Sequence, residues 1–390
     1  MNFAFSEEQE ELRRSVRRFL EGKSPIPEVR RLMETTEGYD EAVWAQMGKE
    51  LGLQALHIPE RYGGQGYSFV ELVVVLEEMG RALLCAPFYA SVCLAANAIL
   101  NAGTEEQRQA LLPGIASGDT IATLAFTEPN GRWDASGITM EAVPASDGPD
   151  GSAGHTLSGT KMFVLDGHTA GLVVVAARRS GSEGTDGISF FTVDGGAEGL
   201  TRTPLPTMDQ TRKQAKLEFS GVPAKLLGPG AGVSPTETGA GWPALSKTLD
   251  QAAVCLCAEM VGGAQRVLDM SVEYAKVRIQ FGRPIGSFQA IKHKCADMLL
   301  EVESAKSAAY YAGWAAAEDN DELPVVASLA KAYCSDAYFH AAAENIQIHG
   351  GIGFTWEHDA HLYFKRAKSS EILLGDATYH RELLAQRIGI

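Results

Sequence analysis

The amino-acid sequence predicts a multi-domain α+β protein with an N-terminal helical domain, a central β-barrel-like or β-sandwich domain and a C-terminal four-helix bundle. Three observations carry this prediction. The chain begins with helical patterns, continues with short β-rich runs between turns, and ends with long helical segments that contain few breakers. We place the domains at residues 1–120, 121–232 and 233–390, because 390 residues are enough for two or three domains.

Helix-start signals support the N-terminal helical domain. Ser6 with Gln9, and Thr104 with Gln107, have the spacing of capping boxes, in which two side chains satisfy amide groups at a helix start. The turn-rich stretch 59–66 interrupts these helices.

The central domain is predicted from a change in composition near Ile121. Short β-rich runs follow one another, separated by turns rich in Gly, Asp, Ser and Pro, as in a compact all-β domain. The runs are TIATLAFT, HTLSG, KMFVL, GLVVVAA, GISFFTV and KLEF.

Long helical segments predict the C-terminal bundle. One helix covers residues 248–278 with little interruption, a second covers 288–317 and a third covers 325–349. A last helix begins near His361 or Ala377.

Composition excludes several classes of protein. The chain has 34 Lys and Arg against 49 Asp and Glu, a net charge of −15, which argues against nucleic-acid binding. No signal peptide, membrane span or CxxC pair is found, and we expect no metal site. The six cysteines favour a reducing cytoplasm.

Four local motifs occur in a characteristic order along the chain. They are IPERYGGQG at 58–66, TEP at 127–129, RIQFGRPIGSFQAIKHKCADM at 278–298 and QIHGGIGF at 347–354. With the α, β, α order of the segments, they make nearly the whole chain resemble the acyl-CoA dehydrogenase family of flavoproteins.

The resemblance implies a fold, a cofactor and a reaction. Family members bind FAD and remove two hydrogens from the α and β carbons of an acyl-CoA thioester. A glutamate takes the α-proton, the flavin takes the β-hydride, and an electron-transfer flavoprotein reoxidises the flavin. Each FAD lies across a subunit interface, and the expected assembly is a homo- or hetero-tetramer.

Residues that face the neighbouring subunit's FAD are carried over from the motifs. By resemblance they are Arg278, Phe281, Gln289, Gln347, Gly350 and Gly351. Arg278 and Phe281 share one side if the helix continues there, and a guanidinium suits a pyrophosphate. The alternative is that Arg278 is a surface charge and the glycine pair is a helix C-cap.

Residues that face the chain's own flavin ring are carried over in the same way. They are Leu124, Thr127, Phe163 and Leu165. A Trp-Ile-Thr triplet usually follows Lys-Met in the family, whereas Phe163-Val164-Leu165 stands here. Leu165 cannot donate a hydroxyl to the flavin N5. The alternative is that Phe163 and Leu165 are ordinary core residues.

The catalytic glutamate of the family is missing from both places where members carry it. Counted from the glycine pairs, these places read Leu374 and Ala252, and neither side chain can take a proton. The nearest acids, Asp376 and Asp250, are weak candidates for the base. An arginine that helps to bind CoA in the family is replaced by Ala253.

Three functions remain open. The first is a catalytic homo-oligomeric acyl-CoA dehydrogenase with a displaced base such as Asp376. The second is an FAD-completing subunit of a heteromer, in which a partner chain carries the glutamate. The third is a flavoenzyme of the same fold with different chemistry. The departures from the family pattern lie among the residues that would perform the chemistry, which favours the second function.

Overall fold

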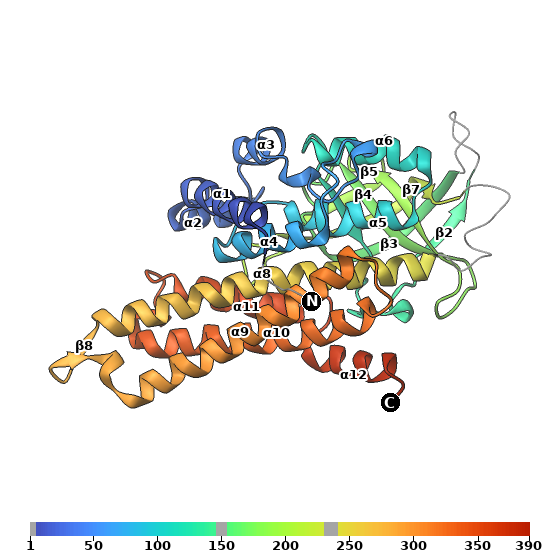
Figure 1. The fold of residues 1–390 in the computed structure, drawn as a ribbon. Coiled ribbons are helices and arrows are strands. Elements are labelled where there is room, and N and C mark those ends of the chain that lie inside the picture. Colours follow the sequence, from blue (N-terminus) through green and yellow to red (C-terminus); the bar gives the residue numbers. More distant parts are fainter. Residues whose placement is uncertain (1–4, 146–153, 230–240) are drawn as a thin grey trace. The chain divides into compact units, whose positions relative to one another are not determined.

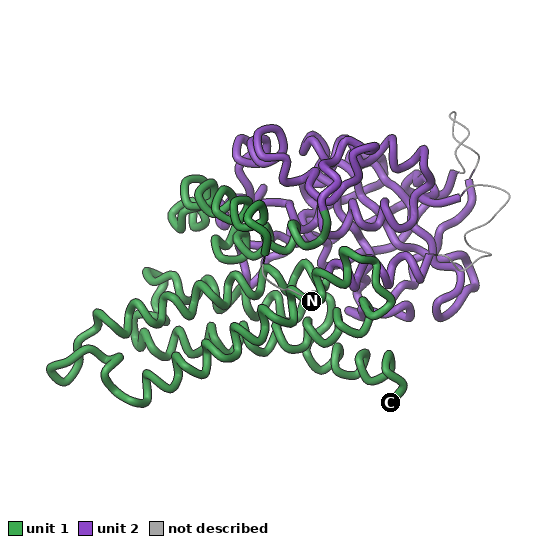
Figure 2. The backbone as a smooth tube through the Cα atoms, in the orientation of Figure 1, with its two compact units in different colours: residues 1–31, 68–85, 253–390 green, residues 32–67, 86–252 purple. Residues whose placement is uncertain are grey.

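The computed structural model describes residues 5–145, 154–229 and 241–390 (Figure 1). The chain forms two compact units, each built from separated segments (Figure 2). The first consists of Met1–Arg31, Ser68–Cys85 and Ala253–Ile390; the second consists of Leu32–Tyr67 and Ala86–Ala252. The predicted domain boundary between residues 232 and 233 lies outside the described residues.

Helices make up the first unit. The three predicted long helices appear as α8, α9 and α10. Both proposed starts of the last helix are confirmed, because α11 and α12 begin at these places. Helix α10 packs against α9, α11 and α12, while α4 packs against α1 and α9. The helices are α1 (Glu7–Lys23), α2 (Ile26–Glu34, which enters the second unit), α4 (Phe69–Arg81), α8 (Gly241–Val277, from Ala253 onward), η5 (Ile285–Ser287), α9 (Gln289–Ala317), α10 (Leu323–His349), η6 (Gly350–Phe354), α11 (Ala360–Ile372) and α12 (Ala377–Arg387).

A seven-stranded, barrel-like sheet dominates the second unit, which confirms the predicted β-domain. Its order is β1-β4-β2-β3-β7-β5, β6 pairs with β7, and a β4–β5 pairing closes the ring. The strands are β1 (Ala122–Ala125), β2 (Glu141–Pro144), β3 (Gly154–Leu165), β4 (Leu172–Arg179), β5 (Ile188–Asp194), β6 (Leu200–Pro204) and β7 (Gln214–Leu227). Side chains such as Val175, Phe191 and Leu217 fill its core.

Shorter helices complete the second unit. They are α3 (Glu41–Lys49), η1 (Leu53–Ala55), η2 (Glu60–Tyr62), the π-helix η3 (Tyr89–Ala96), α5 (Asn97–Ala102), α6 (Glu105–Ala116) and η4 (Ala135–Gly137). The periodicity of the sequence does not reveal the π-helix. The β1 strand lies against it.

The two predicted capping boxes are both present. Ser6 accepts a hydrogen bond from the Gln9 amide at the start of α1, and the Gln9 side chain accepts one from the Ser6 amide. Thr104 and Gln107 form the same pair at the start of α6. Among the described residues, no helix is long and apolar enough to cross a membrane.

Candidate flavin and acyl-CoA site

The four residues predicted to face the flavin ring lie on neighbouring segments of the β-domain. Leu124 is on β1, and Thr127 follows that strand by two residues, while Phe163 and Leu165 are at the end of β3. The Thr127 carbonyl accepts a hydrogen bond from the Met162 amide at 2.8 Å. The structure therefore brings this part of the predicted site together.

Phe163 has an unusual backbone conformation. Its φ is +57°, and it lies where the β3–β7 register shifts between Lys161 and Val164. An aromatic residue at positive φ is strained, and such bulges often redirect a side chain at a functional site. The Phe163 side chain is 42% exposed, whereas Leu165 is buried, so Phe163 is available for stacking and is not ordinary core.

A buried ion pair joins the two segments that carry these residues. The Lys161 ammonium donates to a Glu128 carboxylate oxygen at 2.8 Å, and both side chains are almost fully buried. Glu128 also accepts hydrogen bonds from the Thr139 and Met140 amides. Burial opposes ionisation, but Lys161 and these donors lower the pKa of Glu128. The acid of the TEP motif is thus structural, a role that the motif alone does not reveal.

Arg278 and Phe281 do not continue a helix, so the argument that they share a helix face is wrong. Helix α8 ends at Val277, and a small hairpin follows, with strands β8 (Ile279–Gln280) and β9 (Arg283–Pro284). The hairpin lies at the far end of α8 in Figure 1. Phe281 and Gly282 both have positive φ, at +52° and +76°, as a two-residue type I′ turn requires.

This turn presents Phe281 to the outside. Its side chain is 91% exposed, and Arg278 beside it is exposed too. Phe281 touches the Phe288 ring edge-on at 6.1 Å, and the Arg283 guanidinium lies 4.2 Å from the same ring. Because most of the Phe281 surface stays exposed at a strained tip, despite the contact with Phe288, the conformation favours a role in contacting another molecule.

The remaining residues of this half lie at helix ends. Gln289 is the exposed first residue of α9, and Gln347 is exposed in the last turn of α10. The rings of Tyr274 in α8 and His349 in α10 stack at 4.3 Å, which brings the end of α10 next to the end of α8. Gln347 therefore belongs to the same region of the first unit as the hairpin.

The glycine pair after α10 has both of the features proposed for it. Gly350 is the C-cap of α10, with φ +63° and ψ −142°, a conformation that is essentially confined to glycine. A Cβ placed at Gly350 or Gly351 would meet no atom within 4 Å. The backbone is therefore open to close approach by a ligand.

The first position expected for the base is a short turn between α11 and α12. Leu374 is only 5% exposed and has φ +64°. Asp376 is exposed, and its carboxylate accepts a hydrogen bond from the Tyr379 amide as the N-cap of α12. Asp376 is thus an ordinary capping residue in this structure.

Two buried side chains hold this turn, and the motifs do not point to either. The Lys331 ammonium donates to the Glu371 carbonyl at 3.0 Å, the Gly375 carbonyl at 2.9 Å and the Ser335 hydroxyl at 3.0 Å. His380 contacts the Leu374 carbonyl through Nε2 at 3.0 Å.

Burial shifts the acid–base properties of both groups. It lowers the pKa of Lys331 to about 8 and that of His380 to about 3. Both side chains are buried, so the cluster is shielded from water, which is the environment that a proton-abstracting carboxylate requires. The turn keeps this environment although residue 374 is leucine.

The second position expected for the base also has no side chain that can take a proton. Ala252 is fully buried in α8, and its carbonyl accepts a hydrogen bond from the Tyr89 hydroxyl at 2.7 Å. Asp250 is buried and has interactions of its own.

The residues that the resemblance assigns to a neighbouring subunit's FAD have chemistry that fits this cofactor. An exposed arginine, an aromatic ring at a strained tip and an open glycine backbone are suited to a pyrophosphate and an adenosine. The ring-facing part offers Phe163 for stacking but no hydroxyl at Leu165.

Comparison with known proteins agrees with this geometry. Family models match residues 6–119 as "Acyl-CoA dehydrogenase, N-terminal domain", 123–222 as the middle domain and 239–389 as the C-terminal domain. "Acyl-CoA dehydrogenase IpdE2" of Mycolicibacterium smegmatis is 35% identical over 374 residues, which cover 95% of each chain.

Two solved structures share the fold along the chain. Butyryl-CoA dehydrogenase from Megasphaera elsdenii superposes with a TM-score of 0.90 at 28% identity and covers 100% of both chains. A variant of a protein described as "Tcur3481-Tcur3483 steroid ACAD" superposes with a TM-score of 0.85 at 31% identity and covers 98% of both chains.

Proposed function

Because this chain belongs to the acyl-CoA dehydrogenase family of FAD-binding flavoproteins, we propose that it is the FAD-completing subunit of a heteromeric acyl-CoA dehydrogenase. A partner chain of the same family carries the catalytic glutamate. One observation carries the proposal: the two positions where the resemblance places the family's glutamate are occupied by Leu374 and Ala252, and both residues are buried.

The nearest acids give little support to a displaced base. A general base must reach the substrate's α-carbon from a water-poor environment. Asp376 is exposed and caps α12, whereas Asp250 is buried with interactions of its own. Moving either carboxylate to the base position would require a different backbone.

The exposed hairpin supports the cofactor-completing role. Arg278 and Phe281 would hold the pyrophosphate and adenosine of FAD bound mainly to the partner, and Gly350 would let the backbone approach it. FAD supplies the hydride acceptor for the β-carbon in this reaction. This chain's contribution is to bind and orient the cofactor, while proton abstraction belongs to the partner.

The substrate and the other partners follow from the family. We propose an acyl-CoA thioester as substrate, an electron-transfer flavoprotein as electron acceptor, a tetramer as the assembly and a cytoplasmic location. The relative described by the paired names Tcur3481-Tcur3483 supports a heteromer, and its description as a steroid enzyme favours a ring-bearing acyl group.

The proposal is tested by measuring flavin content and anaerobic flavin bleaching with a panel of acyl-CoAs, including ring-bearing ones. The chain is purified alone and after co-expression with base-carrying family members encoded near it. We expect little FAD, or FAD that no acyl-CoA bleaches, for the lone chain, and bleaching for the complex. Full bleaching by the lone chain would refute the proposal.

Variants identify the reason for each outcome. In the complex, Arg278→Ala should release FAD, whereas Lys276→Ala, which removes an exposed cation two residues earlier, should not. If the lone chain bleaches and Asp376→Ala abolishes the bleaching, the homo-oligomeric alternative with a displaced base replaces our proposal. If FAD binds but only substrates other than acyl-CoA reduce it, the alternative with different chemistry replaces it.

A further inference from the structure

The first unit contains a cavity whose lining includes none of the candidate flavin or base residues. Its volume is about 280 Å³, and helices α1, α4, α8 and α11 contribute to its wall, together with the turn between α1 and α2. The charged or hydroxyl-bearing side chains that matter here are Arg17, Glu21, Glu78, Arg81, Arg266 and Tyr363.

Three guanidinium groups reach this cavity from three different helices. In a chain of net charge −15, this is a local concentration of positive charge. Like charges at short range repel each other unless carboxylates compensate them. The capacity of the cavity to bind an anion therefore depends on how each arginine is already paired.

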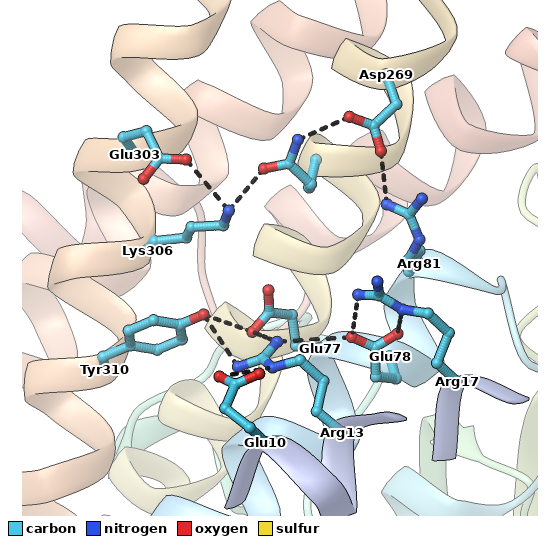
Figure 3. A network of polar contacts seen from close by, with 11 residues as sticks. Glu10, Arg13, Arg17, Glu77, Glu78, Arg81, Asp269, Glu303, Lys306 and Tyr310 are labelled. Carbon is cyan, nitrogen blue, oxygen red and sulfur yellow. Dashed lines mark hydrogen bonds and ion pairs between the residues drawn. The ribbon is translucent and has the colours of Figure 1, made fainter. Parts of the chain in front are cut away.

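The first guanidinium is fully compensated. Both oxygens of Glu78 accept hydrogen bonds from Arg17, through Nε at 2.8 Å and Nη2 at 2.7 Å (Figure 3). The Glu78 side chain is almost completely buried, and Arg13 lies 3.5 Å from it as a second cation. The charge of Glu78 is thus already balanced by Arg17 and Arg13, and it does not compensate the other two arginines of the cavity.

The second guanidinium is engaged on one side only. Arg81 donates through Nη1 to Asp269 at 2.8 Å, and Figure 3 shows this pair beside the Arg17–Glu78 pair. Asp269 also accepts a hydrogen bond from Gln265, which further occupies this carboxylate. Arg81 has a planar fork of donors, and the remaining ones are suited to a second partner.

The third guanidinium is the least compensated. Within the described part of the chain, the carboxylate recorded beside Arg266 is Glu273, and the two are 3.9 Å apart, too far for a hydrogen bond. The Tyr363 hydroxyl hydrogen-bonds to the Arg266 side chain and donates to the Arg81 carbonyl, but it adds no negative charge. Glu21 is exposed to solvent on its helix, so water screens its charge.

We propose that this cavity binds a small oxyanion, a phosphoryl or carboxylate group, between Arg81 and Arg266. Guanidinium groups bind such groups through paired N–H donors, and the partly buried position of both arginines strengthens the attraction. The volume suits a small metabolite or a single terminal group rather than a dinucleotide. The site is independent of the subunit role proposed above.

The test uses the full chain in the form in which it purifies. Inorganic phosphate and succinate are titrated separately by calorimetry and by thermal unfolding, with sodium chloride keeping the ionic strength constant. We expect saturable binding of at least one ion and an increase in the melting temperature. The ion that binds more tightly identifies the phosphoryl or carboxylate source.

Matched variants locate the binding. Arg266→Gln should weaken binding at least tenfold, and Arg81→Gln should act in the same direction. Arg14→Gln is the control, because Arg14 is an exposed arginine of α1 that pairs with Glu11. The proposal is overturned if neither ion binds saturably, if chloride gives the same stabilisation, or if Arg266→Gln binds as tightly as the unaltered chain.

Discussion

Replacing Lys161 by methionine tests whether the buried pair with Glu128 supports the flavin-facing part of the β-domain. At 2.8 Å and an effective dielectric constant of about 20, the attraction between the two charges is about 6 kcal/mol. Removing the ammonium also removes the cost of burying that charge, and this gain offsets part of the lost attraction. We therefore expect Lys161→Met to lower the free energy of unfolding by roughly 3–5 kcal/mol.

Urea unfolding, followed by circular dichroism and tryptophan fluorescence, measures this loss. The control is the double variant Glu128→Gln/Lys161→Met. Its neutral amide can still accept from the Thr139 and Met140 amides, so the double variant should be more stable than the single one. A loss below about 1 kcal/mol for the single variant, or a larger loss for the double one, would refute the reasoning.

Three further predictions concern the residues proposed to contact the partner's FAD and the dependence of stability on pH. Gly350→Ala should lose roughly 1–3 kcal/mol of stability, because alanine is strained at the backbone angles of Gly350, and it should release FAD from the complex. Gly351 has no positive φ, so Gly351→Ala should change stability little. Phe281→Asn should leave the melting temperature unchanged or higher, since asparagine suits the turn, yet reduce the FAD content of the complex; retained FAD would contradict the role of Phe281. Burial lowers the pKa of His57 from 6.5 to about 4, so the unfolded chain binds the proton first, and stability should fall by about 3 kcal/mol as the pH drops from 6.5 to 4. His57→Gln should flatten this part of the stability curve, and an unchanged curve would rule out His57 as the cause.

Patterns of local sequence were sufficient for most of the fold. Capping boxes and uninterrupted apolar stretches reflect interactions within one helix, which is why the starts of α1 and α6 and the extents of α9 and α10 agree with the predictions. Turn-separated β-rich runs likewise predicted the barrel-like sheet. The pairing of β4 with β5, which closes the ring, depends on contacts between distant segments and is not encoded in any local pattern.

The end of α8 shows where local reasoning was insufficient. A helical spacing joined Arg278 to Phe281, but Phe281-Gly282 forms a type I′ turn instead. Phenylalanine rarely adopts positive φ, so propensity argued against this conformation. The motif identified the residues, whereas their presentation on an exposed tip became visible only in the structure.

The side chains that hold the turn at the expected base position could not be predicted from the sequence either. Lys331 lies 40 residues or more from the turn that it holds. It donates to the backbone carbonyls of Glu371 and Gly375, and a contact with the backbone leaves no side-chain motif in the sequence. The role of Glu128 was equally hidden, because its partner Lys161 belongs to another segment of the β-domain.

The hold of Lys331 and His380 on the turn has a consequence for how catalytic labour can be divided among related subunits. Both side chains contact backbone carbonyls, so these contacts do not require a particular side chain at residue 374. Under the role that we propose for this chain, these contacts stay in place whether residue 374 carries a reactive or an inert side chain. In the heteromer that we propose, a reacting chain and a supporting chain would then keep the same turn.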